Sequence, residues 1–245
     1  MTFLFTDLAG FTSLTETQDP EEAVSLLNSY LNQMIKIAKR HGGTIDKVVG
    51  DAVVVIFSAP VDQPDHACDA VDCALEMDIF ADQFSTEQQS KGIPFGETRI
   101  GVNSGKAIIG NFGGDEYFDY TAHGDAINTA ARLESVNKQL GIRIAVSGET
   151  VRRCSSFTGR PVGNLILKGK SKGTEVHEPL CREAEQSQLF ADYCAAFELL
   201  KKKAAGAMKA FSALAKKYPD DGLIQLHLSR LKSGQSGATI EMQSK

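Results

Sequence analysis

The chain has no long hydrophobic run, no excess of positive charge and no signal-peptide pattern. No apolar stretch approaches the ~20 residues that a membrane-spanning helix needs. Charge appears early, at Asp7, and no long apolar segment follows it, so a secretory signal is not expected. The formal net charge of −5 disfavours nucleic acid and anionic membrane surfaces as partners. These absences leave a soluble globular protein as the expected class.

Cysteine also lacks a metal-binding pattern. The five cysteines are odd in number and do not have zinc-ligand spacing, so we expect reduced, mostly packed thiols, which suits the cytoplasm. The chain has 245 residues, of which 42% are hydrophobic, enough for a substantial core. This length fits one large domain or a domain with an appendage.

Two aspartates lie where strands are expected to end. Asp7 follows the apolar run 2–6 and precedes a glycine-containing segment that leads into a helix, and Asp51 precedes the apolar run 52–57. Carboxylates at such positions can hold a hard cation beside a polyphosphate, because a helix N-terminus attracts the anion. Taken alone, Asp7 is better explained as a helix cap and Asp51 as a turn residue. Together with the residues downstream, the pair indicates two Mg²⁺ ions and phosphoryl chemistry.

A second group of polar residues lies on the helix expected to begin at Gly124 and Asp125. Asn128 and Arg132 are four residues apart, so they project from one helix face, one turn above the other. An amide and a guanidinium in this arrangement can orient a sugar oxygen and neutralise charge that develops on a phosphate. The alternative is a solvated pair on an exposed face.

Five motifs of this chain resemble those of the class III nucleotidyl cyclase catalytic domain, in order and with plausible spacing over roughly residues 1–182. They occupy residues 5–12, 47–51, 99–113, 119–134 and 167–170. The likeness is to bacterial adenylate cyclases, and it implies conversion of ATP to 3′,5′-cyclic AMP and pyrophosphate.

The resemblance assigns a role to each candidate residue. Asp7 and Asp51, with the Leu8 carbonyl, are implied to bind two Mg²⁺ or Mn²⁺ ions. One ion would activate the ribose 3′-hydroxyl for attack on the α-phosphate, and the other would hold the β- and γ-phosphates. Asn128 would orient the ribose, and Arg132 would stabilise charge on the α-phosphate.

The triphosphate is expected to bind to backbone groups and lysines. Lys168, on an expected strand, would bind the terminal oxygens, and Lys106 would assist. The backbone N–H groups implied to cradle the phosphates are those of Ala9, Gly10, Phe11 and Thr12.

The base pocket is implied to contain Lys47 and Thr121. Lys47 is a hydrogen-bond donor suited to N1 of adenine, and Thr121 can accept from the exocyclic N6 amine. Guanine presents the reverse pattern, and the guanylyl branch of the family has an acidic residue and a cysteine at these positions. The Lys and Thr pair therefore favours ATP over GTP, although a solvated strand lysine is the alternative for Lys47 alone.

The segment 113–117, Gly-Gly-Asp-Glu-Tyr, resembles the signature of diguanylate cyclases. In that family the signature is a hairpin turn whose acid binds metal. Here the equivalent turn is already supplied by Gly50 and Asp51, so we interpret 113–117 as a loop.

The pattern of strands and helices predicts an α+β sandwich, with a mainly antiparallel sheet and helices packed on it. Helices are expected after the Asp19-Pro20 cap and over 65–83, and strands over 44–49, 52–57, 142–146 and 165–168. Residues 97–111 are expected to form two strands as a hairpin. The family implies a ferredoxin-like, palm-type core. The residues expected to face inward from the two helices are Val24, Leu27, Leu31, Met34, Ile35, Ala38, Ala67, Val71, Ala74, Leu75 and Ile79.

Residues 1–182 form the expected catalytic domain, and 183–245 a helical C-terminal extension. Helices over 186–202, 204–217 and 222–232 resemble a tetratricopeptide-like hairpin with a capping helix. The polar stretch 233–245 is expected to fray.

The family also implies a head-to-tail homodimer with shared active sites, in which one chain supplies the metal aspartates and its twin the base, ribose and transition-state residues. The sequence is compatible with an upstream sensor domain in a longer parent protein and with a membrane anchor for that parent. The competing functions are a guanylate cyclase and a catalytically silent regulatory or interaction module.

Overall fold

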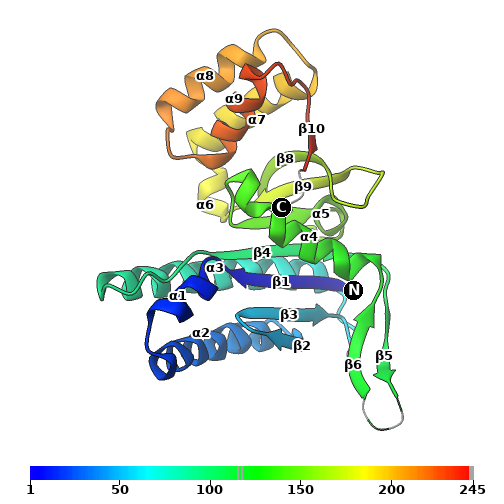
Figure 1. Cartoon of the computed structure of the whole chain (residues 1–245). Coiled ribbons are helices and arrows are strands. Elements are labelled where there is room, and N and C mark those ends of the chain that lie inside the picture. The colour runs from blue at the N-terminus through cyan, green and yellow to red at the C-terminus, as the bar shows by residue number, and fades with distance from the viewer. Residues whose placement is uncertain (115, 117, 243–245) are drawn as a thin grey trace.

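The computed structural model describes residues 1–114, 116 and 118–242. Its main sheet has eight strands in the order β10-β8-β9-β7-β4-β1-β3-β2, and β5 pairs with β6 in a separate two-stranded arm that projects from the body (Figure 1). The strands are β1 (Thr2–Leu8), β2 (Thr44–Val49), β3 (Ala52–Phe57), β4 (Thr98–Ser104), β5 (Ile108–Gly113), β6 (Phe118–His123), β7 (Ile144–Ser147), β8 (Gly159–Ile166), β9 (Thr174–Pro179) and β10 (Thr239–Glu241). The helices are α1 (Phe11–Thr17), α2 (Pro20–Arg40), α3 (His66–Ser90), α4 (Asp125–Leu140), α5 (Gly148–Arg153), α6 (Arg182–Glu185), α7 (Gln188–Lys201), α8 (Ala207–Lys217) and α9 (Gly222–Lys232).

The core of the sheet is a ferredoxin-like βαββαβ unit. Strands β4, β1, β3 and β2 are neighbours in that order, with α2 connecting β1 to β2 and α3 connecting β3 to β4. Strand β1 is antiparallel to both β3 and β4. This is the split βαβ arrangement, so the predicted α+β class and palm-type core are confirmed.

Local sequence signals explain where the first elements begin and end. The Asp19 carboxylate accepts the N–H groups of Glu21 and Glu22, and Pro20 occupies the first turn of α2. Strands β2 and β3 form the predicted hairpin, and Gly50, with a φ of 62°, supplies the left-handed turn between them.

Side chains alternate along β1 between two core layers. Leu4 and Leu8 pack in the cluster that contains the buried faces of α2 and α3, whereas Phe3 packs in a cluster with residues of β6 and α4. Helix α4 lies very close to the sheet at Gly101, where a Cβ atom would come within 2.2 Å of the Ala130 carbonyl oxygen. The absence of a side chain at Gly101 therefore sets the depth at which α4 packs.

Two residues expected to face inward do not. Val24 of α2 is 58% exposed and Ile79 of α3 is 56% exposed. The buried faces of these helices are centred elsewhere, on Tyr30 and Met34 in α2 and on Ala74 in α3. Hydrophobic residues one position off a buried face fit the helical period almost as well as those on it, so periodicity alone misplaced them.

The expected hairpin over 97–111 is also wrong. Strand β4 lies in the main sheet, whereas β5 leaves it and pairs with β6, with Ile108 opposite His123 and Gly113 opposite Phe118. The segment interpreted as a loop, 113–117, joins these two strands. Asp115 and Tyr117 themselves lie outside the described residues.

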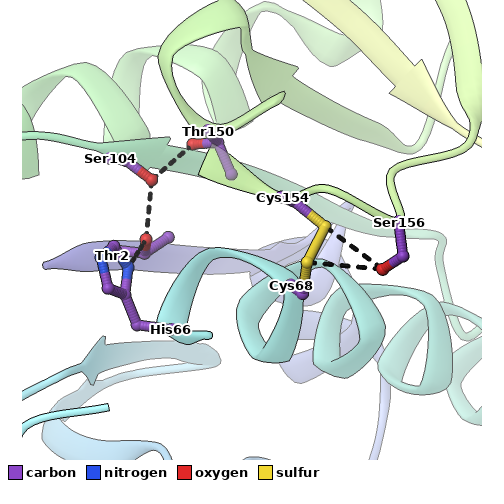
Figure 2. The surroundings of a disulfide bond; sticks show 7 residues. All are labelled: Thr2, His66, Cys68, Ser104, Thr150, Cys154 and Ser156. Carbon is purple, nitrogen blue, oxygen red and sulfur yellow. Dashed lines mark hydrogen bonds between the residues drawn. A yellow bond between two sulfur atoms is a disulfide. The ribbon is translucent and has the colours of Figure 1, made fainter. Parts of the chain in front are cut away.

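The expectation of reduced cysteines is wrong for two of the five. Cys68 of α3 and Cys154 at the end of α5 form a disulfide, with Cα atoms 4.8 Å apart (Figure 2). They are 86 residues apart in the chain, and their spacing carries no signal that they meet. The cysteines that remain as thiols are Cys73, Cys181 and Cys194.

A chain of hydrogen bonds beside the disulfide ties the start of β1 to its neighbours (Figure 2). The Thr2 hydroxyl lies 2.7 Å from both His66 Nδ1 and Ser104 Oγ. Ser104 in turn donates to the Thr150 hydroxyl at 3.0 Å. These bonds connect α3, β1, β4 and α5, and they satisfy hydroxyl groups that would otherwise be buried without partners.

The C-terminal extension shares a core with the sheet. One cluster contains buried residues of β8 and β9 together with residues of α7, α8 and α9. Arg160 of β8 makes ion pairs of 2.6 Å with Glu178 of β9 and with Asp221, the residue that caps α9. The extension is therefore packed on the main sheet through both apolar and ionic contacts.

The expectation that 233–245 frays is wrong for its middle part. Residues Thr239–Glu241 form β10, which pairs in parallel with β8 at the edge of the main sheet. Arg230 fixes the approach to this strand by donating to the carbonyl oxygens of Gly237 and Thr239. Strands β8 and β10 are far apart in the chain, and the polar composition of residues 233–245 does not indicate that a strand forms there.

Within the described residues, no helix is both long and apolar enough to cross a membrane.

The pairing of β10 predicts that the C-terminus contributes to stability. Ile240 is 6% exposed and belongs to the core cluster shared by the sheet and the extension. We expect Ile240→Ala to lower the free energy of unfolding by about 3 kcal/mol, because it removes buried methyl groups and leaves a cavity. Urea denaturation measures this, with the exposed neighbour change Thr239→Ala as the control. Equal free energies of unfolding for the two variants would show that packing of Ile240 and β10 on the sheet does not stabilise the protein.

A buried histidine predicts a pH dependence of stability. His227 is fully buried among Tyr193, Phe197 and Phe211, and burial, together with the nearby Arg230 charge, lowers its pKa to about 3. The unfolded chain takes up this proton near pH 6.5, but the folded chain does not. Stability should therefore fall as the pH decreases from about 6.5, by up to about 1.4 kcal/mol per pH unit for this group.

The variant His227→Leu should lose this part of the pH dependence. Urea denaturation between pH 7 and pH 5 compares the slopes of the two proteins, and equal slopes would contradict the assignment.

Candidate active site

The two candidate metal aspartates lie beside each other at one end of the sheet. The Leu8 N–H, at the end of β1, donates to Asp51 Oδ2, in the β2–β3 turn, at 3.0 Å. Further into the sheet, the Val53 N–H of β3 donates to the Thr6 hydroxyl of β1 at 3.0 Å. These bonds tie the turn that carries Asp51 to the strand that carries Asp7.

The pKa of Tyr30, on α2, is affected by the charges of both carboxylates. Its hydroxyl is hydrogen-bonded to Thr98 at 2.7 Å, below the end of β1, where Thr98 pairs with Leu8. Burial raises the pKa of Tyr30 well above its usual range, and the negative charges of Asp51 and Asp7 raise it further.

The segment after β1 supplies fewer free N–H groups than expected. The Ala9 N–H donates to the Glu97 carbonyl oxygen at 2.8 Å, so it cannot cradle a phosphate in this conformation. Gly10, with a φ of 76°, is the N-cap of α1, and Phe11 and Thr12 are the first helical residues. The predicted cradle is therefore reduced to the N–H groups of these last three residues.

The donor chemistry at Asp7 and Asp51 fits a hard divalent ion. Two carboxylates and the Leu8 carbonyl are oxygen ligands, which Mg²⁺ takes in small number from protein while keeping waters and substrate phosphates. In the part of the chain that the structure describes, no group of three or more His, Cys, Asp or Glu side chains could hold an ion. A metal here would therefore complete its coordination with water or phosphate oxygens.

The two candidate base-pocket residues lie on contacting strands. Thr121 of β6 is 6% exposed, and its hydroxyl has no hydrogen-bond partner. Strand β6 contacts β2, which carries Lys47. The Lys47 side chain is 44% exposed, and its Nζ lies 3.5 Å from Oδ2 of the buried Asp46. A donor and an unpaired hydroxyl thus lie on neighbouring strands.

Asn128 and Arg132 lie on α4, on the side away from the buried face of the helix. Asn128 is exposed and Arg132 is partly buried. A Cβ atom at Gly169 would lie 3.8 Å from Nη2 of Arg132, so the guanidinium lies against the turn after β8. The structure therefore brings Arg132 close to the turn that carries Lys168.

Lys168 was expected to lie on a strand, but it does not. Strand β8 ends at Ile166, and Lys168 occupies an exposed turn. Lys170 fixes this turn to α4, because its Nζ bonds to Asp125 Oδ2 at 2.8 Å and to the Thr129 hydroxyl at 2.6 Å. Lys170 belongs to the 167–170 motif, but the triphosphate role was predicted from the sequence for Lys168 and no role for Lys170.

Lys106 is placed apart from the metal aspartates of its own chain. It lines a cavity of about 330 Å³ with Asp125 and Lys170, next to the start of β1. The Gly105 N–H donates to the Met1 carbonyl oxygen, whereas Asp7 lies at the opposite end of the strand. In one chain, the candidate groups thus form two sets, one around Asp7 and Asp51 and one along α4 and the 167–170 turn.

Comparisons with known proteins agree on the family. The family model described as the adenylate and guanylate cyclase catalytic domain matches residues 1–178. Adenylate cyclase 1 of Rhizobium meliloti is 36% identical over 179 residues, which cover 73% of this chain and 27% of that protein. The adenylate cyclase of Anabaena cylindrica is also 36% identical, over 183 residues that cover 73% of this chain and 36% of that protein. The chain therefore spans about a third or less of the curated relatives it matches.

Solved structures of both nucleotide specificities are similar. The adenylyl cyclase CyaB from P. aeruginosa has a TM-score of 0.68 and 36% identity, covering 74% of this chain and 93% of that chain. The guanylyl cyclase Cya2 has a TM-score of 0.63 and 32% identity, covering 73% of this chain and 90% of that chain. With the family match over most of its length, this chain belongs to the class III adenylate and guanylate cyclase catalytic domain family.

Proposed function

We propose that this protein is an adenylate cyclase that converts ATP to 3′,5′-cyclic AMP and pyrophosphate. The observation that carries the proposal is the buried Thr121 hydroxyl, which has no partner and lies on a strand in contact with the strand of Lys47. An unpaired buried hydroxyl is unfavourable unless a ligand satisfies it. The Thr121 hydroxyl can accept a hydrogen bond from the N6 amine of adenine, and Lys47 can donate one to N1.

In the proposed reaction, the ribose 3′-oxygen attacks the α-phosphorus, and the bond to the β-phosphate oxygen breaks to release pyrophosphate. Asp7, Asp51 and the Leu8 carbonyl would hold two Mg²⁺ or Mn²⁺ ions, which when bound would lower the pKa of the 3′-hydroxyl and neutralise phosphate charge. Asn128 orients the ribose, and Arg132 stabilises the charge that develops on the α-phosphate.

The proposal assigns the triphosphate contacts to Lys168 and to the start of α1. Lys168, on the turn that Lys170 fixes to α4, would bind the terminal phosphate oxygens. The N–H groups at the start of α1 offer positive dipole to the same anion. Lys106 assists only if the triphosphate reaches the cavity near Asp125.

The proposal includes a head-to-tail homodimer. Large apolar side chains are exposed on β2 and on the β5–β6 arm, which projects from the body (Figure 1). They are Val48, Val49, Ile108, Phe118 and Tyr120. Exposed apolar residues gathered on neighbouring strands favour a protein interface. Two-fold pairing through this surface would join the Asp7 and Asp51 set of one chain to the α4 set of its twin.

A sensor domain in a longer parent protein is part of the proposal, because the curated relatives extend well beyond the matched segment. The relatives do not identify its signal.

The base pocket predicts nucleotide choice. The double change Lys47→Glu with Thr121→Cys should reduce the ratio of kcat/KM for ATP to that for GTP by at least about tenfold, because it inverts the donor and acceptor pattern. Steady-state assays of cyclic AMP and cyclic GMP measure the ratio. The matched charge reversal Lys36→Glu, on the exposed side of α2, should leave it unchanged.

The wild-type assay separates the competing functions. Equal rates with ATP and GTP would contradict the base-pocket assignment, and preference for GTP would make the protein a guanylate cyclase. The similarity to Cya2 is the observation that keeps this second candidate. No turnover of either nucleotide with Mn²⁺ would favour a silent interaction module.

The dimer predicts complementation between inactive chains. Asp51→Ala and Arg132→Ala should each lower kcat by about 100-fold or more, since each removes a group that acts in the transition state. Random mixing makes half of the dimers heterodimers, each with one intact site of two. The mixture should therefore regain about a quarter of the wild-type specific activity.

Heterodimer formation is checked with two affinity tags. If heterodimers form and activity does not return, all groups of one site come from a single chain, and the shared-site proposal is wrong.

A further inference from the structure

Asp46 is a buried carboxylate with no role in the fold that the described contacts reveal. It lies on β2, an edge strand of the main sheet, yet its side chain is 0% exposed. Neither carboxylate oxygen accepts a hydrogen bond. The one ionic contact is with Lys47, whose Nζ lies 3.5 Å from Asp46 Oδ2. A buried charge without hydrogen bonds is unfavourable, so its presence calls for a function.

The backbone of β2 explains how these two neighbours meet. Ile45 pairs with Val55 and Lys47 pairs with Val54, so Asp46 is the extra residue of a β-bulge. In a regular strand, adjacent side chains point to opposite faces. Here their charged groups are 3.5 Å apart, so the bulge turns both side chains to the same side.

That side of β2 faces strand β6, which carries the other candidate base-pocket residue. Val54, the residue opposite the bulge, packs in the cluster that contains Ala122 of β6 and Ile127 of α4. Thr121, with its unpartnered hydroxyl, is the neighbour of Ala122 on β6. The bulge therefore directs a carboxylate and an ammonium toward the strand that carries Thr121.

We propose that Asp46 is a positioning residue for base selection, which holds the Lys47 ammonium in place to donate to N1 of adenine. This rests on the proposed adenylate cyclase function. Lys47 has a long, flexible stem, and its ammonium must be fixed before it can discriminate between bases. The buried Asp46 carboxylate draws the ammonium toward one location by charge. Guanine presents an N1–H donor at this location and is disfavoured by the held cation.

A structural role for Asp46 has a different signature. A carboxylate that stabilises a bulge accepts backbone N–H groups, and Asp46 accepts none. Its replacement by the nearly isosteric amide removes the buried charge and breaks no hydrogen bond. We therefore expect this change to weaken ATP recognition without lowering stability.

The test is Asp46→Asn in the full chain, with steady-state kinetics for ATP and GTP and with binding of fluorescent ATP and GTP analogues. We expect KM for ATP and Kd for the ATP analogue to rise roughly tenfold, the effect of losing one fixed charged hydrogen bond. KM for GTP and Kd for its analogue should stay the same or fall, because the released ammonium no longer opposes the guanine N1–H, and kcat should fall less than about threefold. Thermal stability should be unchanged or higher. Asp46→Glu should restore part of the ATP affinity.

The matched control is Asp82→Asn. Asp82 is 60% exposed, pairs with Arg143 and lies on α3, away from the base pocket. It should leave all these values at wild-type level.

Unchanged ATP affinity and ATP:GTP selectivity in Asp46→Asn overturn the proposal. A loss of thermal stability with equal losses for both nucleotides also overturns it, because that pattern indicates a structural residue. A wild-type protein that binds the ATP analogue but forms no cyclic AMP contradicts the proposed reaction instead. In that case the two binding measurements still decide the role of Asp46.

Discussion

The register of β1 between β3 and β4 determines where the chemistry of this molecule lies. Phe5 pairs with Val54 and with Gly101, so the strand is held on both edges and buried on both faces. A slip of one residue would exchange the faces of every side chain on β1. In the observed register the Leu8 N–H reaches Asp51, and the two carboxylates meet at one end of the sheet. The placement of the candidate metal ligands is thus a consequence of strand pairing.

The remaining candidate groups depend on how closely α4 approaches that sheet. Gly101 admits the helix backbone, and Lys170 then ties the 167–170 turn to Asp125 and Thr129 of the helix. Strand β10 pairs with β8 immediately before this turn, and the Met242 N–H donates to the Ile166 carbonyl oxygen. The C-terminal extension therefore completes the sheet at the strand that leads to Lys168. The C-terminal segment, whose composition suggests an accessory part, thus contacts β8, the strand that leads to the candidate 167–170 turn.

The sequence predicts those features that are written locally, and it fails where partners are distant. The Asp19 cap and the β2–β3 turn each depend on a few adjacent residues, and both are found as predicted. The pairing of β5 with β6, the position of β10 and the disulfide each require knowledge of where remote segments lie. The candidate residues were chosen from motifs, but the loss of the Ala9 N–H to the Glu97 carbonyl could be known only from the folded chain.

The distribution of unsatisfied polar groups separates stability from function in this fold. Asn137 leaves one amide oxygen unpaired while its nitrogen serves two carbonyl groups, and His177 and His227 each leave one ring nitrogen. Each of these side chains is neutral or has a lowered pKa that keeps it neutral, so the penalty is modest. Asp46 differs, because it is a carboxylate with neither oxygen hydrogen-bonded. Among the described residues, the unpaired buried carboxylate and the unpaired Thr121 hydroxyl lie on two contacting strands. The buried Arg160, in contrast, is paired with Glu178 and Asp221. A buried carboxylate and a buried hydroxyl without partners on two contacting strands are therefore the polar groups of this fold that a ligand could satisfy.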